Sequence, residues 1–176
     1  MKPCVFFDRD GIVNVAPTTR YVETFAAFHL QEAFYDALAV AQRRGYVAVI
    51  VTNQKGVSTG KTPLAELQAM HRHIFDEAER RGLSILALYY CDAPNDEHPN
   101  RKPNPGMLLE AAREHDLDLA RSWMVGDNGS DVVTGQRAGC RTIFVGTKTI
   151  AVTPDFTVPD MAHLPALLEA CLPDVR

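Results

Sequence analysis

The sequence predicts an α/β fold, a three-layer, Rossmann-like arrangement around a central parallel sheet, and three observations support this expectation. Short segments that are apolar throughout alternate with longer segments whose apolar residues recur at helical spacing. Several of the longer segments are followed by a glycine, the residue that most often ends a helix. Strands without a polar face are buried on both sides, and parallel pairing supplies the covering helices as crossover connections.

The first elements set the pattern. Residues 3–7 (PCVFF) are expected to form a buried strand, and residues 31–45 a helix that stops at Gly45. Residues 46–51 (YVAVIV) form the next expected strand. Residues 63–81 then have the spacing of a second amphipathic helix.

The rest of the chain repeats this alternation. Further strands are expected over residues 84–90, 122–126 and 141–146, and further helices over residues 105–115 and 130–138. After residue 146 the regularity is lost, although residues 157–172 suggest a closing helix. No linker rich in Pro, Gly or Ser divides the chain, so residues 1–176 are expected to form a single domain.

Composition argues against several classes of partner. With 46% apolar and 23% charged residues the chain resembles a soluble globular protein, and a net charge of −4 disfavours a surface for nucleic acid or anionic lipid. No leader is recognisable, and no apolar stretch approaches the roughly 20 residues of a membrane span. A cytoplasmic protein is therefore expected, and nothing in the sequence specifies its oligomeric state.

Polar side chains follow four of the predicted strands, namely Asp8 and Asp10, Thr52 and Asn53, Arg101 and Lys102, and Asp127 and Asp131. In an open parallel sheet, ligands bind beyond the carboxyl ends of the strands, which meet at one edge. The sequence therefore predicts that these side chains share one site.

Each group alone has an ordinary structural explanation. Asp8 and Asp10 can be loop acids that satisfy backbone donors, and Thr52 and Asn53 can cap a helix or form a turn. Lys102 can be a solvated cation, and GDNGSD an ordinary loop between strand and helix. Their joint occurrence favours a site for a divalent cation and a phosphoryl group.

The residue types suit that chemistry. Mg²⁺ prefers oxygen ligands and needs only one or two carboxylates beside a carbonyl and a phosphate oxygen. A carboxylate can also attack phosphorus and form an aspartyl-phosphate, which divides hydrolysis into two easier steps. A lysine and a hydroxyl then hold the equatorial oxygens of the phosphoryl group.

The segments DRDGIVN, VTNQ, RKPNPGM and GDNGSD closely resemble, in order, the four motifs of the haloacid dehalogenase (HAD) superfamily of aspartate-nucleophile phosphatases. Within it, FFDRDGIVN, TNQKGVSTGK and RKPNPGMLLEAA are similar to the group of heptose 1,7-bisphosphate and histidinol-phosphate phosphatases. The resemblance covers nearly the whole chain. It implies a Mg²⁺-dependent phosphatase with an aspartyl-phosphate intermediate.

The resemblance also implies roles for single residues. Asp8 is expected to be the nucleophile and a Mg²⁺ ligand, and Asp10 the general acid and base, with its backbone carbonyl on the metal. Thr52 and the amide of Asn53 are expected to bind the transferred phosphoryl group. Lys102 is expected to neutralise that group and steady Asp8.

The later motifs complete the implied site. Asp127 is expected to be a metal ligand, and Arg101 to contact substrate. For Asp131 three roles stay open, because a second acid in this position can bind the metal, contact its waters or orient the lysine.

The chain departs from this group in two places. A zinc loop with Cys-x-His and Cys-x-Cys pairs is common there, but here Ala93 replaces the histidine, and Cys91 with His98 supplies at most two of about four ligands. No structural zinc is therefore expected. Asn128 stands where heptose bisphosphatases often have a lysine, which weakens the case for a second phosphate at that place. Nearby cations are candidates to compensate: Arg9, Arg20, Lys55 and Lys61.

The spacing of the motifs leaves no room for a cap domain, so the site is expected to be open, with specificity supplied by loops near residues 14–24, 55–61 and 91–101. An open site accepts a small metabolite or a macromolecular phosphoester. A sugar phosphate such as D-glycero-D-manno-heptose 1,7-bisphosphate is the first expectation, and histidinol phosphate or another small metabolite the alternative.

Two functions outside this class share part of the pattern. A phosphorylatable receiver module of a signalling system also combines acids, Thr and Lys around a parallel sheet, but it takes phosphate on an aspartate after a later strand. A catalytically silent binding module is the other, although all the main chemical residues are present. His71 and His73 lie two apart on a predicted helix, where side chains do not share a face, so a metal pair there is not expected.

Overall fold

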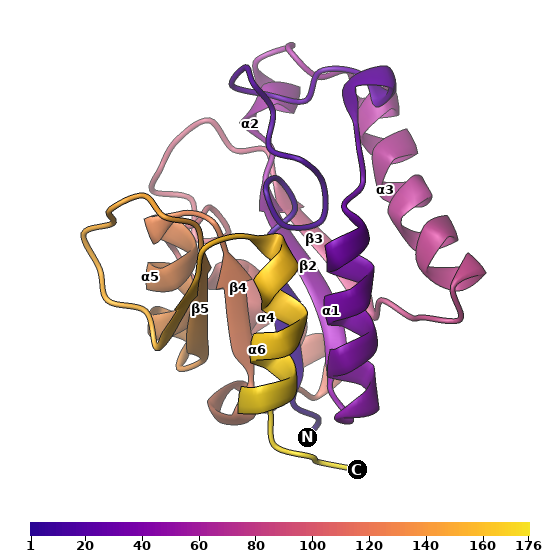
Figure 1. The fold of residues 1–176 in the computed structure, drawn as a ribbon. Helices are drawn as coiled ribbons and strands as arrows, with labels where there is room; N and C mark the ends of the chain where they lie inside the picture. The colour runs from indigo at the N-terminus through magenta and orange to yellow at the C-terminus, as the bar shows by residue number, and fades with distance from the viewer.

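The structure, a computed structural model, describes residues 1–176 and consists of a six-stranded parallel sheet between two layers of helices (Figure 1). The strands, in the spatial order β3-β2-β1-β4-β5-β6, are β1 (Cys4–Phe7), β2 (Val47–Asn53), β3 (Ala87–Cys91), β4 (Trp123–Gly126), β5 (Arg141–Val145) and β6 (Phe156–Val158). The helices are α1 (Glu32–Arg43), α2 (Lys55–Ser58), α3 (Leu64–Arg80), α4 (Gly106–His115), α5 (Gly129–Ala138) and α6 (Leu164–Cys171). Short 3-10 helices are η1 (Phe25–Ala27), η2 (Leu119–Arg121) and η3 (Met161–His163). The predicted fold class is confirmed.

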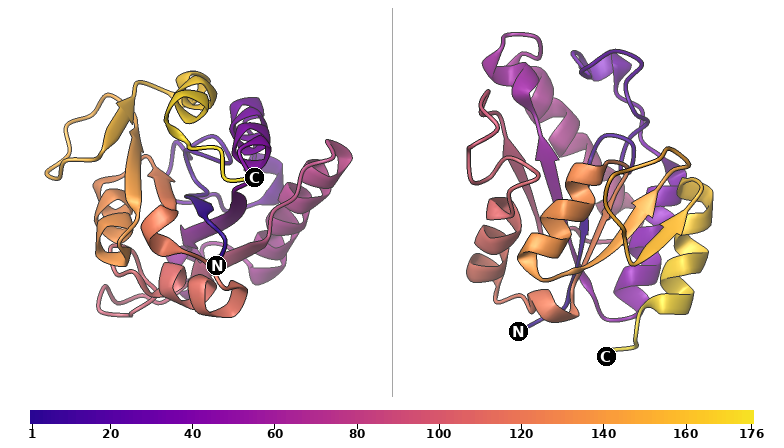
Figure 2. Two further views of the ribbon diagram at one scale, coloured as in Figure 1. Left: turned by 90° about the horizontal axis from the view of Figure 1, so that it is seen from below. Right: turned by 90° about the vertical axis from the view of Figure 1, so that its left-hand side faces the viewer.

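The central strand shows why the strand sequences are apolar throughout. Successive side chains of β1 point to opposite faces of the sheet, so Val5 and Phe7 pack in the cluster with α1, α3 and α6, whereas Cys4 and Phe6 pack in the cluster with α4 and α5. All four are completely buried. The views along and across the sheet show the two helical layers on its opposite faces (Figure 2).

The order of the strands determines where a ligand can bind. The chain runs from β1 outward through β2 to β3 on one side, and then returns to place β4 on the other side of β1. The loops that leave β1 and β4 therefore diverge, and a crevice forms at their carboxyl ends. Asp8 is fixed at this point, since its backbone N–H donates to the carbonyl of Val125 at 2.9 Å.

Two differences from the expected elements bear on the site. Thr52 and Asn53 are the last residues of β2, so they extend the strand instead of following it. The segment expected to be one closing helix first forms β6, and α6 begins only at Leu164. β6 pairs at the edge of the sheet and has only three residues. A strand of that length is too short to produce a recognisable hydrophobic pattern in the sequence.

No helix of the structure has the length and apolar character that crossing a membrane requires.

Candidate active site

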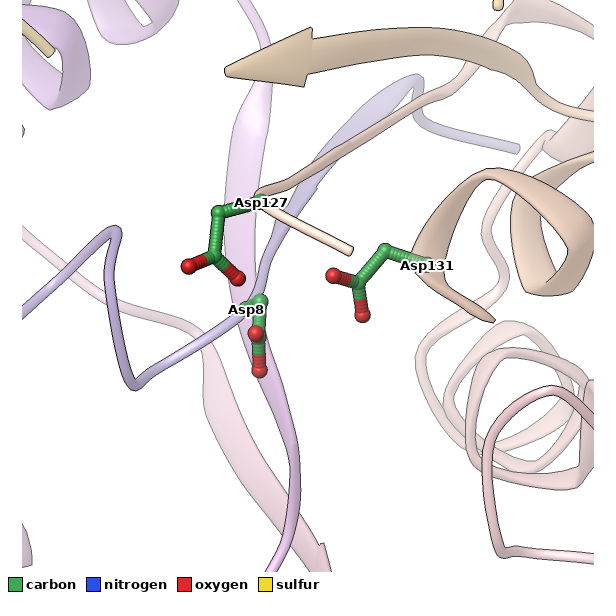
Figure 3. Close-up of side chains that lie close together, drawn as sticks. All are labelled: Asp8, Asp127 and Asp131. Atoms are coloured by element: carbon green, nitrogen blue, oxygen red, sulfur yellow. The ribbon is translucent and has the colours of Figure 1, made fainter. Parts of the chain in front are cut away.

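Three carboxylates converge at the carboxyl ends of β1 and β4. One oxygen from each of Asp8, Asp127 and Asp131 lies within 4.8 Å of the others. Figure 3 shows the three side chains close together, extending from the end of β1, the end of β4 and the start of α5. Asp8 and Asp131 are only 5% and 1% exposed, so the group is largely shielded from water.

Two glycines permit this close approach. Gly11 has a φ of +91°, and a Cβ added there would lie 2.2 Å from Oδ2 of Asp127. At Gly126 a Cβ would meet the side chain of Asp131 at 2.3 Å. Any larger residue at either position would push a carboxylate out of the cluster, which explains the glycine in both acidic motifs.

A buried lysine links two of the carboxylates. Nζ of Lys102 donates to Oδ1 of Asp8 at 2.6 Å and to Oδ1 of Asp131 at 2.7 Å. The side chain of Asn53 holds the backbone of Lys102 from both sides, because its Nδ2 donates to the lysine carbonyl and its Oδ1 accepts from the lysine N–H, each at 3.0 Å. The Asn53 side chain therefore fixes the position of the lysine.

Both oxygens of Asp131 are in use. Besides accepting from Lys102, the carboxylate accepts from the backbone N–H of Asn128 at 3.0 Å, which completes the capping box at the start of α5. Of the three roles that the sequence left open, this geometry matches the orientation of the lysine. Asp127, in contrast, accepts only from the side chain of Asn128, at 2.8 Å.

The carboxylates of the cluster carry more negative charge than Lys102 alone can neutralise. Burial, and then the charge of Asp131, raises the pKa of Asp8 well above its usual value, although Lys102 opposes this. Burial and Asp131 likewise raise the pKa of Asp127 to about 6. One lysine cannot neutralise three carboxylates, and a divalent cation with oxygen ligands fits the donor set that remains.

Asp10 lies beside this cluster in a different environment. Its Oδ1 accepts from Nε and Nη2 of Arg9, at 3.2 and 2.9 Å, and from Nδ2 of Asn14 at 3.0 Å. Its Oδ2 accepts from Nε2 of Gln54 at 3.0 Å. Burial alone would raise the pKa of Asp10, but Arg9 and these hydrogen bonds lower it below the usual value.

Two adjoining cavities meet at Asp10. The first, about 140 Å³, has no hydrophobic lining and is formed by Asp8, Asp10, Thr52, Asn53, Lys102, Asn128, Ser130 and Asp131. The second, about 120 Å³, is lined by Asp10, Arg20, Tyr21, Asn53, Gln54, Lys55 and Arg101. The predicted site residues therefore come together, except that Arg101 lines the second cavity and Asp127 approaches the first through the carboxylate cluster.

Cations from the three loops that are predicted to supply specificity line the second cavity. Arg20, Lys55 and Arg101 come from different loops, and Nε of Arg101 donates to the exposed carboxylate of Asp96 at 2.8 Å. Of the other compensating cations considered, Lys61 lines neither cavity and Arg9 is fully buried against Asp10.

A further cation, which no sequence motif indicates, lies beside the site. Nζ of Lys148, in the loop after β5, donates to Oδ1 of Asn128 at 2.8 Å. The side chain of a lysine twenty residues later in the chain therefore reaches position 128. Only the folded chain shows this, because no spacing rule links the two positions.

The loop that departs from the zinc pattern is closed by hydrogen bonds. Sγ of Cys91 and Nδ1 of His98 are 3.6 Å apart, so the two remaining ligand types do lie together. Nδ2 of Asn104 donates to the carbonyls of Asp96 and His98 at 3.1 and 3.0 Å. Two nitrogen or sulfur donors do not make a structural zinc site.

Comparison with known proteins places the chain in a family. The model of the HAD-hydrolase-like family matches residues 99–164. A D-glycero-β-D-manno-heptose-1,7-bisphosphate 7-phosphatase of Mesorhizobium japonicum is 36% identical, with 96% of this chain and 82% of the relative covered. The protein of that name from Vibrio cholerae is 35% identical, with 86% and 82% covered.

Solved structures agree with these relatives. A had-like phosphatase from Mesorhizobium loti superposes with a TM-score of 0.81 and 33% identity, covering 99% of this chain and 90% of that one. The D,D-heptose 1,7-bisphosphate phosphatase of B. bronchiseptica, solved with magnesium and phosphate, gives 0.83 and 28%, covering 96% and 98%. The chain belongs to the HAD superfamily, in the family of the D-glycero-D-manno-heptose-1,7-bisphosphate 7-phosphatases.

Proposed function

We propose that the chain is a Mg²⁺-dependent phosphomonoester hydrolase that acts through an aspartyl-phosphate on a small phosphorylated sugar, with D-glycero-D-manno-heptose 1,7-bisphosphate as the first candidate. The observation that carries this proposal is the cluster of Asp8, Asp127 and Asp131, two of which accept hydrogen bonds from Nζ of the buried Lys102 at the wall of a small polar cavity. It combines a nucleophile, a phosphate-binding cation and ligands for a metal in one place.

In the first half of the reaction, an oxygen of Asp8 attacks the phosphorus atom, and the bond from phosphorus to the sugar oxygen breaks. Asp10 gives its proton to that leaving oxygen. Lys102, already bound to Asp8 at 2.6 Å, donates to the oxygens of the transferring group, and Thr52 at the cavity wall donates beside it.

In the second half, Asp10 takes a proton from a water molecule, and the water oxygen attacks the phosphorus of the aspartyl-phosphate. Inorganic phosphate leaves and Asp8 is regenerated as a carboxylate. Asp8, Asp127 and the backbone carbonyl of Asp10 would hold a Mg²⁺ ion, which would supply positive charge to keep Asp8 ionised and to neutralise the phosphoryl oxygens.

The two protonation states of Asp10 follow from its surroundings. Its lowered pKa makes it a carboxylate in the free protein, which is the form required of a base. A bound phosphate dianion adds negative charge beside it and raises its pKa toward the form required of an acid. The same residue can therefore serve both halves of the reaction.

The second cavity supports a substrate with a second anionic group. Relatives in this family are named for a 1,7-bisphosphate, and here Arg20, Lys55 and Arg101 surround a space next to the phosphoryl site. Histidinol phosphate carries an ammonium group instead, which three cations would repel. This contrast favours the sugar bisphosphate over the histidinol alternative.

The remaining expectations belong to the same proposal. We propose a single capless domain over residues 1–176 that works in the cytoplasm, carries no structural zinc and binds no nucleic acid. Only short elements, η1 and α2, interrupt the loops between β1 and α1 and between β2 and α3, which supports the absence of a cap.

The experiment is a hydrolysis screen with the full chain and Mg²⁺. Phosphate release is measured for the heptose 1,7-bisphosphate, the heptose 7-phosphate, other sugar phosphates and histidinol phosphate, with and without EDTA. The proposal expects the highest kcat/KM for the bisphosphate and no release with EDTA. Release that persists in EDTA, or none from any substrate, would contradict it.

A further inference from the structure

We propose that Gln54 is a positioning residue that holds Asp10 in place for proton transfer and fixes the direction of the Thr52 hydroxyl. This inference rests on the proposed phosphatase function. Gln54 is the last residue of the VTNQ segment. The residue is 4% exposed, and its side chain joins the acid–base residue to the phosphoryl site.

The geometry is a bridge made by one amide group. Nε2 of Gln54 donates to Oδ2 of Asp10 at 3.0 Å and to Oγ1 of Thr52 at 2.9 Å. The backbone of Gln54 is held as well, since its N–H donates to the carbonyl of Cys91 at 2.7 Å where β2 meets β3. The bridge therefore starts from a fixed point at the end of the sheet.

The chemistry of the partners sets the orientation of the amide. An ionised carboxylate only accepts hydrogen bonds, so the nitrogen of Gln54 must face Asp10. The hydroxyl of Thr52 then accepts from the same nitrogen, which leaves its own proton free to donate elsewhere. Thr52 lines the polar cavity, so that proton is available to an oxygen of the transferring phosphoryl group.

The two oxygens of Asp10 are held unequally. Oδ1 accepts from both Arg9 and Asn14, and Arg9 is itself fully buried and contacts Nε2 of His71 at 3.4 Å. Oδ2 accepts from Gln54 alone. Removing the Gln54 donor should leave Asp10 attached but free to turn about its other oxygen, which misdirects the proton.

A general acid that points in the wrong direction changes the rates of different substrates unequally, whereas a general loss of folding does not. Protonation matters most when the leaving oxygen is strongly basic, and least when the leaving group departs easily without a proton. For this reaction kcat/KM reports the step in which that oxygen leaves. A positioning role therefore predicts losses that grow with the basicity of the leaving group.

The experiment compares Gln54→Met, which keeps the volume without the donor, and Gln54→Glu, which keeps the length, with the wild type. The matched control is Gln136→Met, at an exposed glutamine on α5 that donates to the carbonyl of Thr153. Substrates are p-nitrophenyl, phenyl and p-methoxyphenyl phosphate with Mg²⁺. Thermal unfolding verifies that each variant is folded.

For Gln54→Met we expect kcat/KM to fall about 100-fold with phenyl phosphate and about tenfold or less with p-nitrophenyl phosphate. The inhibition constant of inorganic phosphate should rise by about threefold to tenfold, because the Thr52 proton is no longer directed into the cavity. The control should match the wild type in both measurements.

Equal losses for all three aryl phosphates, or losses no larger than those of the control, would overturn the inference. A steep dependence on leaving-group basicity in the wild type would also overturn it, without any variant, because the leaving oxygen would then depart unprotonated. A wild-type protein that hydrolyses none of the phosphoesters would instead contradict the proposed function itself.

Discussion

Lys102 is a lysine whose charged group is buried among carboxylates. It is 6% exposed, and its ammonium group donates hydrogen bonds to two of the three clustered carboxylates, Asp8 and Asp131. The charges of Asp131 and Asp8 raise its pKa despite the opposing effect of burial, so the lysine stays charged. Its removal would leave buried carboxylates without a partner.

Replacing Lys102 with methionine should therefore affect activity and stability together. We expect kcat to fall by at least about 100-fold, and the free energy of unfolding without Mg²⁺ to fall by about 3 kcal/mol at neutral pH. Lys61→Met, at an exposed lysine outside both cavities, is the control. An unchanged urea midpoint would show that Lys102 does not neutralise the cluster.

Asp127 gives a prediction about pH. Burial and Asp131 raise its pKa to about 6, above the value in the unfolded chain. The folded protein thus holds this proton more tightly, and the stability that it contributes at low pH is lost as the pH rises from about 4 through 6.

Without a divalent cation, the contribution of Asp127 to the free energy of unfolding should therefore decrease by up to about 3 kcal/mol between about pH 4 and pH 6. Mg²⁺ binds the deprotonated form, so its effect on the melting temperature should be larger at pH 7 than at pH 5. The measurement is thermal unfolding with and without Mg²⁺ at both pH values. An equal Mg²⁺ effect at both would be inconsistent with Asp127 as a ligand.

At the residue scale, the motif residues could be predicted from the sequence, whereas the residues that hold them in position could not. Asp8, Asp10 and Lys102 follow strands and stand in recognisable segments. For His71 the sequence does carry a signal, namely its place next to Met70 on the buried face of α3. Burial, and then Arg9, lowers its pKa to about 3, so its ring is neutral and can accept from Arg9.

At the scale of elements, the loops decide which substrate fits. The strands end at a common edge, but the loops that follow bring Arg20, Lys55 and Arg101 to one cavity. Their meeting could not be predicted, because loop direction has no period in the sequence. That these three loops determine which substrate binds stays a prediction.

Arg20→Ala and Lys55→Ala test that role of the loops. Each should lower kcat/KM about tenfold for the heptose 1,7-bisphosphate and little for the 7-phosphate, because only the former presents a second anion to the cavity. Lys61→Ala is the matched control. Parallel losses for both substrates would mean that these cations act on the fold or on the transferred phosphate.

The loop of residues 91–104 gives an element-scale prediction about zinc. Its hydrogen bonds from Asn104 and Arg101 close the segment, and Cys91 with His98 offers only two ligands. Protein purified without chelator should contain no stoichiometric zinc by metal analysis. A melting temperature that a zinc-selective chelator lowers would refute this expectation.

At the scale of the whole molecule, the sheet order explains why distant segments form one site. β4 pairs in parallel with β1 on the side opposite β2, and this brings Asp8 next to Asp127 and Asp131, more than a hundred residues away. The alternation of strands and helices predicted this arrangement, because the longer elements have clear hydrophobic patterns. It missed β6 and α2, whose three and four residues are too short for a pattern.

The central claim is that Asp8 is the nucleophile of a Mg²⁺-dependent phosphatase, and the most direct measurement is turnover by Asp8→Asn. The variant keeps the shape of the side chain and removes the attacking charge. We expect no hydrolysis of the heptose 1,7-bisphosphate above background with Mg²⁺, while thermal unfolding shows a folded protein. Hydrolysis by a folded Asp8→Asn protein at a rate near that of the wild type would contradict the account.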